Sequence, residues 1–100
     1  MELDRTFGPK YGSGQTLSVT DTTQSVTFGQ NNWALTVTNL GSDVCYVRTG
    51  NGTIAATTAD YPVLPLSQVS LSKNYDDDKL AVICGSGDTT SLHVIQGEGI

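Results

Sequence analysis

Short blocks in which apolar and polar residues alternate are the feature of this sequence that most constrains its fold. Apolar side chains stand at every second position of each block, at 17 and 19, 26 and 28, 33, 35 and 37, and 69 and 71. A period of two places such side chains on one face of a β-strand, whereas a helix needs a period of about 3.6. No stretch of the chain has the helical period, so we expect an all-β fold.

The blocks recur at spacings of about 8 to 12 residues with turn residues between them, which predicts about eight short strands in an antiparallel β-sandwich, with the jelly roll as one candidate topology. Residues 16–20 and 25–28 are predicted to form a hairpin-like pair, and residues 53–56 a short strand. Residues 59–65 contain two prolines, which cannot donate ladder hydrogen bonds, so we expect a loop or an edge segment. Residues 80–84 are apolar at consecutive positions, which favours a strand buried on both faces.

The length of 100 residues predicts one domain, because the pieces of a split chain would be too small to bury a useful core. Residues 1–15 have neither period and are rich in glycine and other breakers, so we predict an extended N-terminal arm. The arm carries Leu3, Phe7 and Tyr11, which are too apolar for a purely solvated tail. We therefore expect a single β-sandwich domain over residues 16–100, with an arm able to lie across a neighbouring subunit.

The chain is acidic, with ten Asp and Glu residues against five Lys and Arg residues and a formal net charge of −5. This balance argues against nucleic-acid phosphates and anionic membranes as partners, because both attract clustered basic side chains. No window of about 20 apolar residues is present, so we expect no membrane span. The charged N-terminus is not followed by an apolar run, so we expect no secretory signal and synthesis in a cytoplasm.

Cys45 and Cys84 are the only cysteines, and each lies within an apolar, strand-like block. In a reducing compartment such cysteines are buried thiols that pack as small hydrophobic side chains. A disulfide stays open as an alternative if the two strands pair. Zinc is not expected, because the chain offers only three Cys and His residues, far apart in sequence and without the paired spacing of zinc ligands.

The sequence has no motif for catalysis or for a cofactor. His93 is the only histidine and no Gly-x-Ser-x-Gly nucleophile motif accompanies it, so we expect it on a sheet face. Asp76, Asp77 and Asp78 lack the alternating ligands of a calcium-binding EF-hand loop, which favours a solvated acidic turn. The glycine clusters do not form a phosphate loop. We therefore predict a protein that is not an enzyme and that holds no metal and no cofactor.

Three aromatic residues are candidates for either the core or a binding surface. Trp33 begins an alternating strand, so we expect it in the core. Tyr46 lies within a strand, and both interpretations stay open. Tyr61 stands beside Pro62 in the irregular segment, so we expect it to be exposed, where aromatic side chains are favoured anchors at protein interfaces.

The chain from Val37 onward carries a resemblance to a known family. Its segments read VTNLG at 37–41, CYVRTG at 45–50, ATTADYPVLP at 56–65 and LAVIC at 80–84, with Gly97-Glu98-Gly99 near the end. This pattern resembles small accessory virion proteins of tailed bacteriophages, in which similar segments form a compact β-sandwich.

The resemblance implies a decoration or cement protein that sits on the phage capsid, often as a trimer, and braces neighbouring capsid subunits. The implied partner is the major capsid protein or another virion protein, and the implied location is the virion. By this analogy the N-terminal arm and the loop at 60–65 are the contact elements. The contact residues that we select are Leu3, Arg5, Phe7, Tyr11, Asp60, Tyr61 and Pro62.

Related small β-sandwiches also occur in phage tails and fibres, so a second hypothesis stays open. In that case the chain is a carbohydrate- or receptor-binding module of a tail or head fibre. Tyr46, Tyr61 and Tyr75 are the side chains available for stacking against sugar rings. The sequence does not separate the two hypotheses.

Overall fold

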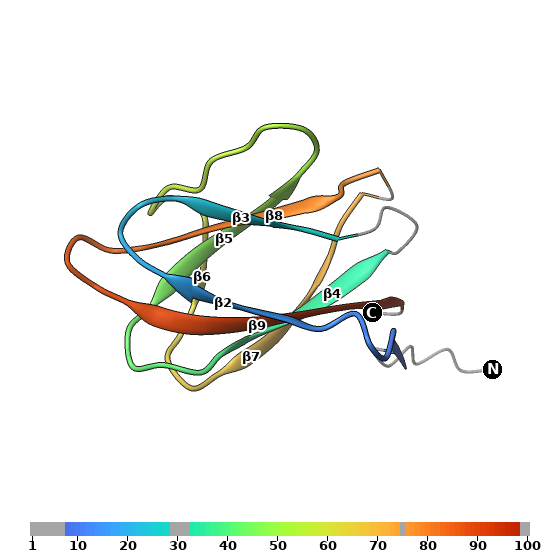
Figure 1. Cartoon of the computed structure of the whole chain (residues 1–100), viewed down its shortest axis with the longest axis horizontal. Coiled ribbons are helices and arrows are strands. Elements are labelled where there is room, and N and C mark those ends of the chain that lie inside the picture. The colour runs from blue at the N-terminus through green and yellow to red at the C-terminus, as the bar shows by residue number, and fades with distance from the viewer. Residues whose placement is uncertain (1–7, 29–32, 75, 99–100) are drawn as a thin grey trace.

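The structure of the chain, a computed structural model, describes residues 8–28, 33–74 and 76–98. These residues form two antiparallel β-sheets packed face to face, and no helix occurs among them (Figure 1). The strands are β1 (Gly8–Pro9), β2 (Gln15–Val19), β3 (Gln24–Thr27), β4 (Ala34–Asn39), β5 (Cys45–Gly50), β6 (Tyr61–Val63), β7 (Gln68–Ser72), β8 (Lys79–Cys84) and β9 (Thr90–Glu98).

Strands β2 to β9 have the topology of a jelly roll. One sheet has the order β2-β9-β4-β7, and the facing sheet has the order β3-β8-β5-β6. The chain crosses from one sheet to the other at every connection except β5 to β6, as in a jelly roll built from two Greek keys. The prediction of an all-β antiparallel sandwich is confirmed, and the eight jelly-roll strands match the expected number. The two-residue strand β1 is additional.

The described part of the predicted N-terminal arm, residues 8–15, lies along the edge of the chain's own sheet. Strand β1 pairs with the far end of β9, with Gly8 opposite Glu98 and Pro9 opposite Gly97. Strand β2 then begins at Gln15, the last residue assigned to the arm, and pairs with the first half of β9. The longest strand, β9, therefore has both β1 and β2 on one side and β4 on the other.

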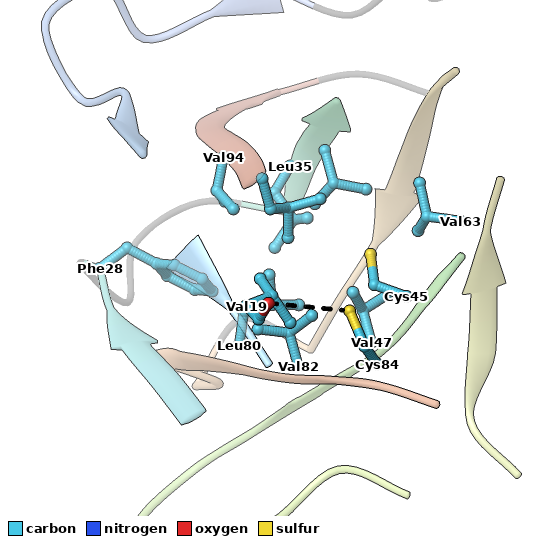
Figure 2. Packing of buried hydrophobic residues seen from close by; sticks show 12 residues of the cluster. Val19, Phe28, Leu35, Cys45, Val47, Val63, Leu80, Val82, Cys84 and Val94 are labelled. Carbon is cyan, nitrogen blue, oxygen red and sulfur yellow. Dashed lines mark hydrogen bonds between the residues drawn. The ribbon is translucent and has the colours of Figure 1, made fainter. Parts of the chain in front are cut away.

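Side chains from both sheets meet in a single hydrophobic core (Figure 2). The alternation at 35 and 37 places Leu35 and Val37 in this core, and Leu80 and Val82 face them from the other sheet. Leu17, Val26, Val69 and Leu71 pack at its margins. Core residues are Val19, Phe28, Leu35, Val37, Cys45, Val47, Val63, Leu80, Val82, Cys84, Leu92 and Val94.

Two predicted local elements are wrong. The segments 16–20 and 25–28 do not form a hairpin, because β2 pairs with β9 and β3 pairs with β8 in the opposite sheet. Alternation shows that a strand has one buried face, but two such strands can either pair side by side or face each other across a core. The segment 53–56 is not a strand: it belongs to the long β5–β6 connection, which arches over the outer side of the four-stranded sheet (Figure 1).

Two other strand predictions are confirmed. The proline-containing segment forms β6 at the edge of the four-stranded sheet, where proline's missing N–H is tolerated. Strand β8 lies between β3 and β5, and Leu80, Ala81 and Val82 are fully buried although they point alternately to the two faces of the sheet.

The β5–β6 connection lies on the outer face of this four-stranded sheet. There the N–H of Ala56 donates a 2.8 Å hydrogen bond to Thr23 Oγ1.

Candidate functional site

The predicted contact residues fall on two different edges of the sandwich. Leu3, Arg5 and Phe7 lie outside the described residues. Tyr11 lies at the edge of the five-stranded sheet, between β1 and β2. The other three, Asp60, Tyr61 and Pro62, lie at the start of β6, the edge strand of the facing sheet.

Tyr11 projects from a tight turn that interrupts the pairing between the N-terminal segment and β9. The N–H of Lys10 donates a 2.7 Å hydrogen bond to the carbonyl of Gln96, and the N–H of Ser13 donates to the carbonyl of Lys10 at 3.1 Å. Gly12 takes a φ of +86°, the left-handed conformation that suits glycine. Hydrogen bonds thus fix the turn on both sides of Tyr11, whose side chain is 86% exposed. The turn holds a large aromatic ring in solvent.

The carboxylate of Asp60 shapes the loop before β6. Its Oδ1 lies 3.2 Å from Nε of Arg48, and its Oδ2 accepts a 2.8 Å hydrogen bond from the N–H of Thr57. Both carboxylate oxygens therefore have partners within the chain. The next two residues, Tyr61 and Pro62, are exposed, as predicted for Tyr61. Asp60 acts on this surface by positioning its neighbours.

Three exposed leucines, which are not among the predicted contact residues, extend the surface of β6 toward the end of the sandwich. Leu64 and Leu66 follow β6 and are 59% and 79% exposed, and Leu40 after β4 is 51% exposed. The N–H of Asn39 donates a 2.8 Å hydrogen bond to the carbonyl of Ser67, which brings Leu40 beside the β6–β7 turn. We call Leu40, Tyr61, Pro62, Leu64 and Leu66 the β6–β7 corner.

A signal for this corner is present in the sequence. Residues 61–72 contain no charged side chain, although the chain as a whole carries a net charge of −5. Two leucines flank Pro65 in the segment predicted to be a loop or an edge. Such a segment leaves at least one of the two side chains exposed. Grouped apolar side chains on a surface are typical of contact sites, whereas scattered ones are ordinary.

The turn bearing Tyr11 and the β6–β7 corner lie on opposite sides of the sandwich. On one side, Nε2 of Gln15 in β2 donates a 2.8 Å hydrogen bond to the carbonyl of Thr27 in β3. On the other, Nδ2 of Asn39 in β4 donates a 3.0 Å hydrogen bond to the carbonyl of Val63 in β6. Strand β2 is an edge strand of its sheet on the side of β3, whereas β6 is the edge strand of the facing sheet on the side of β4. The fold therefore presents two separate exposed surfaces and does not bring the predicted residues together.

The expectation that Trp33 lies in the core is wrong. Strand β4 begins at Ala34, so Trp33 lies beyond the end of the strand and is 54% exposed, although it shares the register of Leu35 and Val37. Tyr46 is half-buried. In the β5–β6 register it pairs with Pro62, whereas Tyr61 pairs with Val47, so the two tyrosines point to opposite faces of their sheet and form no common stacking platform. Tyr75 lies outside the described residues.

His93 lies on the outer face of the five-stranded sheet, as expected, because its neighbours Leu92 and Val94 point into the core. Its Nδ1 is 3.0 Å from the hydroxyl of Thr16, its cross-strand partner in β2. The backbone of Gly14 passes so close that a Cβ there would lie 2.8 Å from the imidazole ring. Glycine at this position therefore makes room for the histidine.

The acidic turn at Asp76–Asp78 is more tightly built than a simple solvated turn. Nζ of Lys73 donates a 2.9 Å hydrogen bond to the carbonyl of Asp77 and lies 5.5 Å from the centre of the Phe28 ring. Burial lowers the pKa of Lys73, and the nearby carboxylate of Asp77 opposes this shift. The carboxylate of Asp78 lies 3.8 Å from the ammonium group of Lys79. Lys73 thus holds the main chain of the turn, and Lys79 balances part of its charge.

Within residues 8–28, 33–74 and 76–98, no three His, Cys, Asp or Glu side chains gather as metal ligands would. The same part of the chain holds no helix long and apolar enough to cross a membrane.

No protein-family model matches the chain, and no curated protein matches its sequence. The fold is similar to that of several solved structures, among them the following two. The structure described as that of PirA is 8% identical, has a TM-score of 0.61, and aligns over 87% of this chain and 95% of its own length. A Cupin_2 domain of an XRE family transcriptional regulator from Enterobacter cloacae is 10% identical, has a TM-score of 0.52, and aligns over 94% and 96%. At these identities the similarity establishes the β-sandwich fold alone.

Proposed function

We propose that this protein is a structural virion protein that binds the assembled capsid of a tailed phage and stabilises it, as a decoration or cement protein does. The observation that carries the proposal is the presence of two exposed surfaces on opposite sides of one sandwich, the turn that holds the ring of Tyr11 and the apolar β6–β7 corner. A body with two such surfaces is suited to contact two neighbours in a lattice at the same time.

The chemistry of the two surfaces supports protein contacts. The β6–β7 corner offers aromatic and aliphatic side chains without charge, and burial of apolar area contributes about 25 cal/mol per Å². A protein that binds the assembled lattice better than the free subunits stabilises the lattice by linkage. The two different surfaces can also meet head to tail between copies of this chain and close a ring, which accommodates the trimer implied by the family resemblance.

The fold accommodates this function without specifying it. Jelly rolls occur in viral capsid proteins, lectins and cupins, so a function must be argued from surfaces and not from topology. Two observations support the proposal. The segments from Val37 onward resemble accessory virion proteins, and Tyr61, Pro62 and Leu64, which lie in one of these segments, are exposed.

Co-sedimentation with purified capsids of the encoding phage tests the proposal. We expect saturable binding that weakens at least tenfold in the variants Tyr11→Ser and Leu64→Ser/Leu66→Ser, and that is unchanged in Thr53→Ala, an exposed position on the β5–β6 connection. Wild-type protein that fails to sediment with capsids would reject the function. Binding to a glycan array that is lost in Tyr61→Ala would favour the fibre module instead.

A further inference from the structure

Cys45 and Cys84 stand directly opposite each other in the antiparallel pair of β5 and β8. Both are free thiols, and 0% and 2% of their surfaces are exposed. Figure 2 shows their sulfur atoms on the same side of the sheet, directed into the core between Val47 and Val63. Residues that lie 39 positions apart in the sequence thus place two reactive groups side by side.

The hydrogen bonding of the main chain makes this a close pair. The N–H of Cys84 donates a 2.8 Å hydrogen bond to the carbonyl of Thr20, so the polar main-chain groups of Cys84 point away from β5. Cys45 and Cys84 are therefore a non-hydrogen-bonded pair, in which Cα atoms are about 4.5 Å apart and side chains are closest. Disulfides bridge Cα atoms that are roughly 4.4 to 6.8 Å apart, so the strand geometry places the thiols within bridging range.

The present partners of the two sulfur atoms are weak. Sγ of Cys84 donates to the carbonyl of Val19 at 3.9 Å (Figure 2), and Sγ of Cys45 accepts from Nδ2 of Asn39 at 3.8 Å. Asn39 keeps its stronger bonds to main-chain carbonyls if Cys45 is oxidised. Joining the sulfur atoms therefore sacrifices one weak S–H donor and no strong hydrogen bond.

We propose that Cys45 and Cys84 form a dithiol site that a small disulfide, such as oxidised glutathione, converts into a cross-strand disulfide. The thiolate of one cysteine attacks a sulfur of oxidised glutathione, forming a mixed disulfide and releasing one glutathione thiolate. The second cysteine thiolate attacks the protein sulfur of the mixed disulfide, so the cross-strand S–S bond forms and the second glutathione leaves. The two cysteine protons pass to the two glutathione thiolates, the protein dithiol is oxidised and glutathione is reduced.

The reaction takes place in molecules in which β5 and β8 have locally separated or have not yet paired during folding. Burial, and secondarily the neighbouring Cys84, raises the pKa of Cys45 to about 12, and burial also raises the pKa of Cys84. Thiolate is the attacking species, so folded protein at neutral pH reacts slowly. The bond forms during folding or local opening and is then enclosed by the core. This pairing depends on the fold alone and not on capsid binding.

Refolding of the full chain from denaturant in a buffer of reduced and oxidised glutathione tests the proposal. We expect a folded product whose intact mass is lower by two hydrogen atoms, with no thiol left for maleimide labelling after denaturation. We also expect its Tm to exceed that of the reduced protein by about 10 °C, because the bridge restricts the unfolded chain. A product that stays fully reduced, that carries only glutathione adducts or intermolecular disulfides, or that loses the native circular dichroism spectrum on closure would overturn the proposal.

A control variant tests whether the pairing depends on strand register. It leaves the sequence separation of the two cysteines almost unchanged but places one of them on the other face of the sheet. In Cys45→Ala/Tyr46→Cys the thiol moves by one residue to the outer face of the sheet, away from Cys84. We expect this variant to form mixed disulfides with glutathione but no intramolecular bridge, and an intramolecular bridge of equal yield would contradict the assignment. Ellman titration of the denatured products counts the thiols in each case.

Discussion

The hydroxyl of Thr90 donates a 2.6 Å hydrogen bond to Oδ1 of Asn39, which joins the start of β9 to the end of β4 inside the sandwich. The same Oδ1 accepts from the N–H of Gly41 at 3.1 Å, while Nδ2 donates to the carbonyls of Asp43 at 2.8 Å and Val63 at 3.0 Å. Asn39 is fully buried, and its amide therefore connects both sheets and the β4–β5 turn. These four hydrogen bonds position the end of the sandwich that carries the β6–β7 corner.

Asn39→Ala is expected to lower the free energy of unfolding by about 2 to 4 kcal/mol, because it leaves the buried carbonyl of Val63 and the hydroxyl of Thr90 without their partner. Urea unfolding measures the change. Ser18→Ala, at an exposed position of β2, is the control and should stay within about 0.5 kcal/mol of wild type. Equal stability of both variants would show that the network contributes little.

Gly41→Ala is expected to destabilise the fold, because a Cβ at Gly41 would overlap Oγ1 of Thr90 and lie 3.1 Å from its Cα. We expect a loss of about 1 to 3 kcal/mol, in the range found for overpacking. In the double variant Gly41→Ala/Thr90→Ala part of the overlap disappears, so the two losses should sum to more than the measured total. Gly8→Ala, where a Cβ would meet only Glu98 O at 3.9 Å, serves as the control. If the losses of the two single variants add up to that of the double variant, the predicted overlap between position 41 and Thr90 is contradicted.

Alkaline pH is expected to destabilise the reduced protein through its buried thiols. The folded-state pKa of Cys45 is raised from 9.0 to about 12, and that of Cys84 is raised too, so above about pH 9 the unfolded chain loses protons that the folded chain keeps. Stability therefore falls as pH rises from about 9 toward 12, with a limiting slope of about 1.4 kcal/mol per pH unit for each thiol. Urea unfolding under reducing conditions should show this loss relative to Cys45→Ala/Cys84→Ala, while the difference between the two proteins stays constant from pH 6 to pH 8. If the free energies of unfolding of the two proteins follow parallel pH profiles over the whole range, the predicted contribution of the thiols is contradicted.

Leu66→Gly is expected to raise the stability of the fold and at the same time to weaken capsid binding. Leu66 has a φ of 55°, a left-handed conformation that is costly for leucine, and its side chain is mostly exposed. Glycine should raise the free energy of unfolding by roughly 0.5 kcal/mol, while the loss of the leucine side chain weakens capsid binding. Thermal unfolding and co-sedimentation give the two readouts. A stabilised variant that binds capsids as well as wild type would remove Leu66 from the contact surface.

Much of the fold can be predicted from the two-residue period. It identifies β4 and β7 almost residue by residue, because apolar side chains stand at every second position of each strand and pack in or against the core. It does not identify partners: β2 and β3 have the alternation of a hairpin and yet lie in opposite sheets. Pairing is decided by β8 and β9, which are more than 50 residues away in the sequence, and no local pattern reports that contact.

The candidate site could be predicted only in part. Proline indicates an edge strand, and this places Tyr61 correctly in solvent. The register that Trp33 shares with Leu35 predicts a core position, but the strand begins one residue later and leaves the ring outside the sheet. Leu40 joins the β6–β7 corner through the hydrogen bond between Asn39 and Ser67, a contact between distant segments that composition does not reveal.

Electron cryomicroscopy of capsids saturated with the protein tests its role most directly. We expect ordered jelly-roll density on the outer capsid surface, with the β6–β7 corner and the Tyr11 turn each against a neighbouring subunit, either of the capsid protein or of another copy of this chain. Capsids that carry no added density, or density in which both surfaces face open solvent, would contradict it.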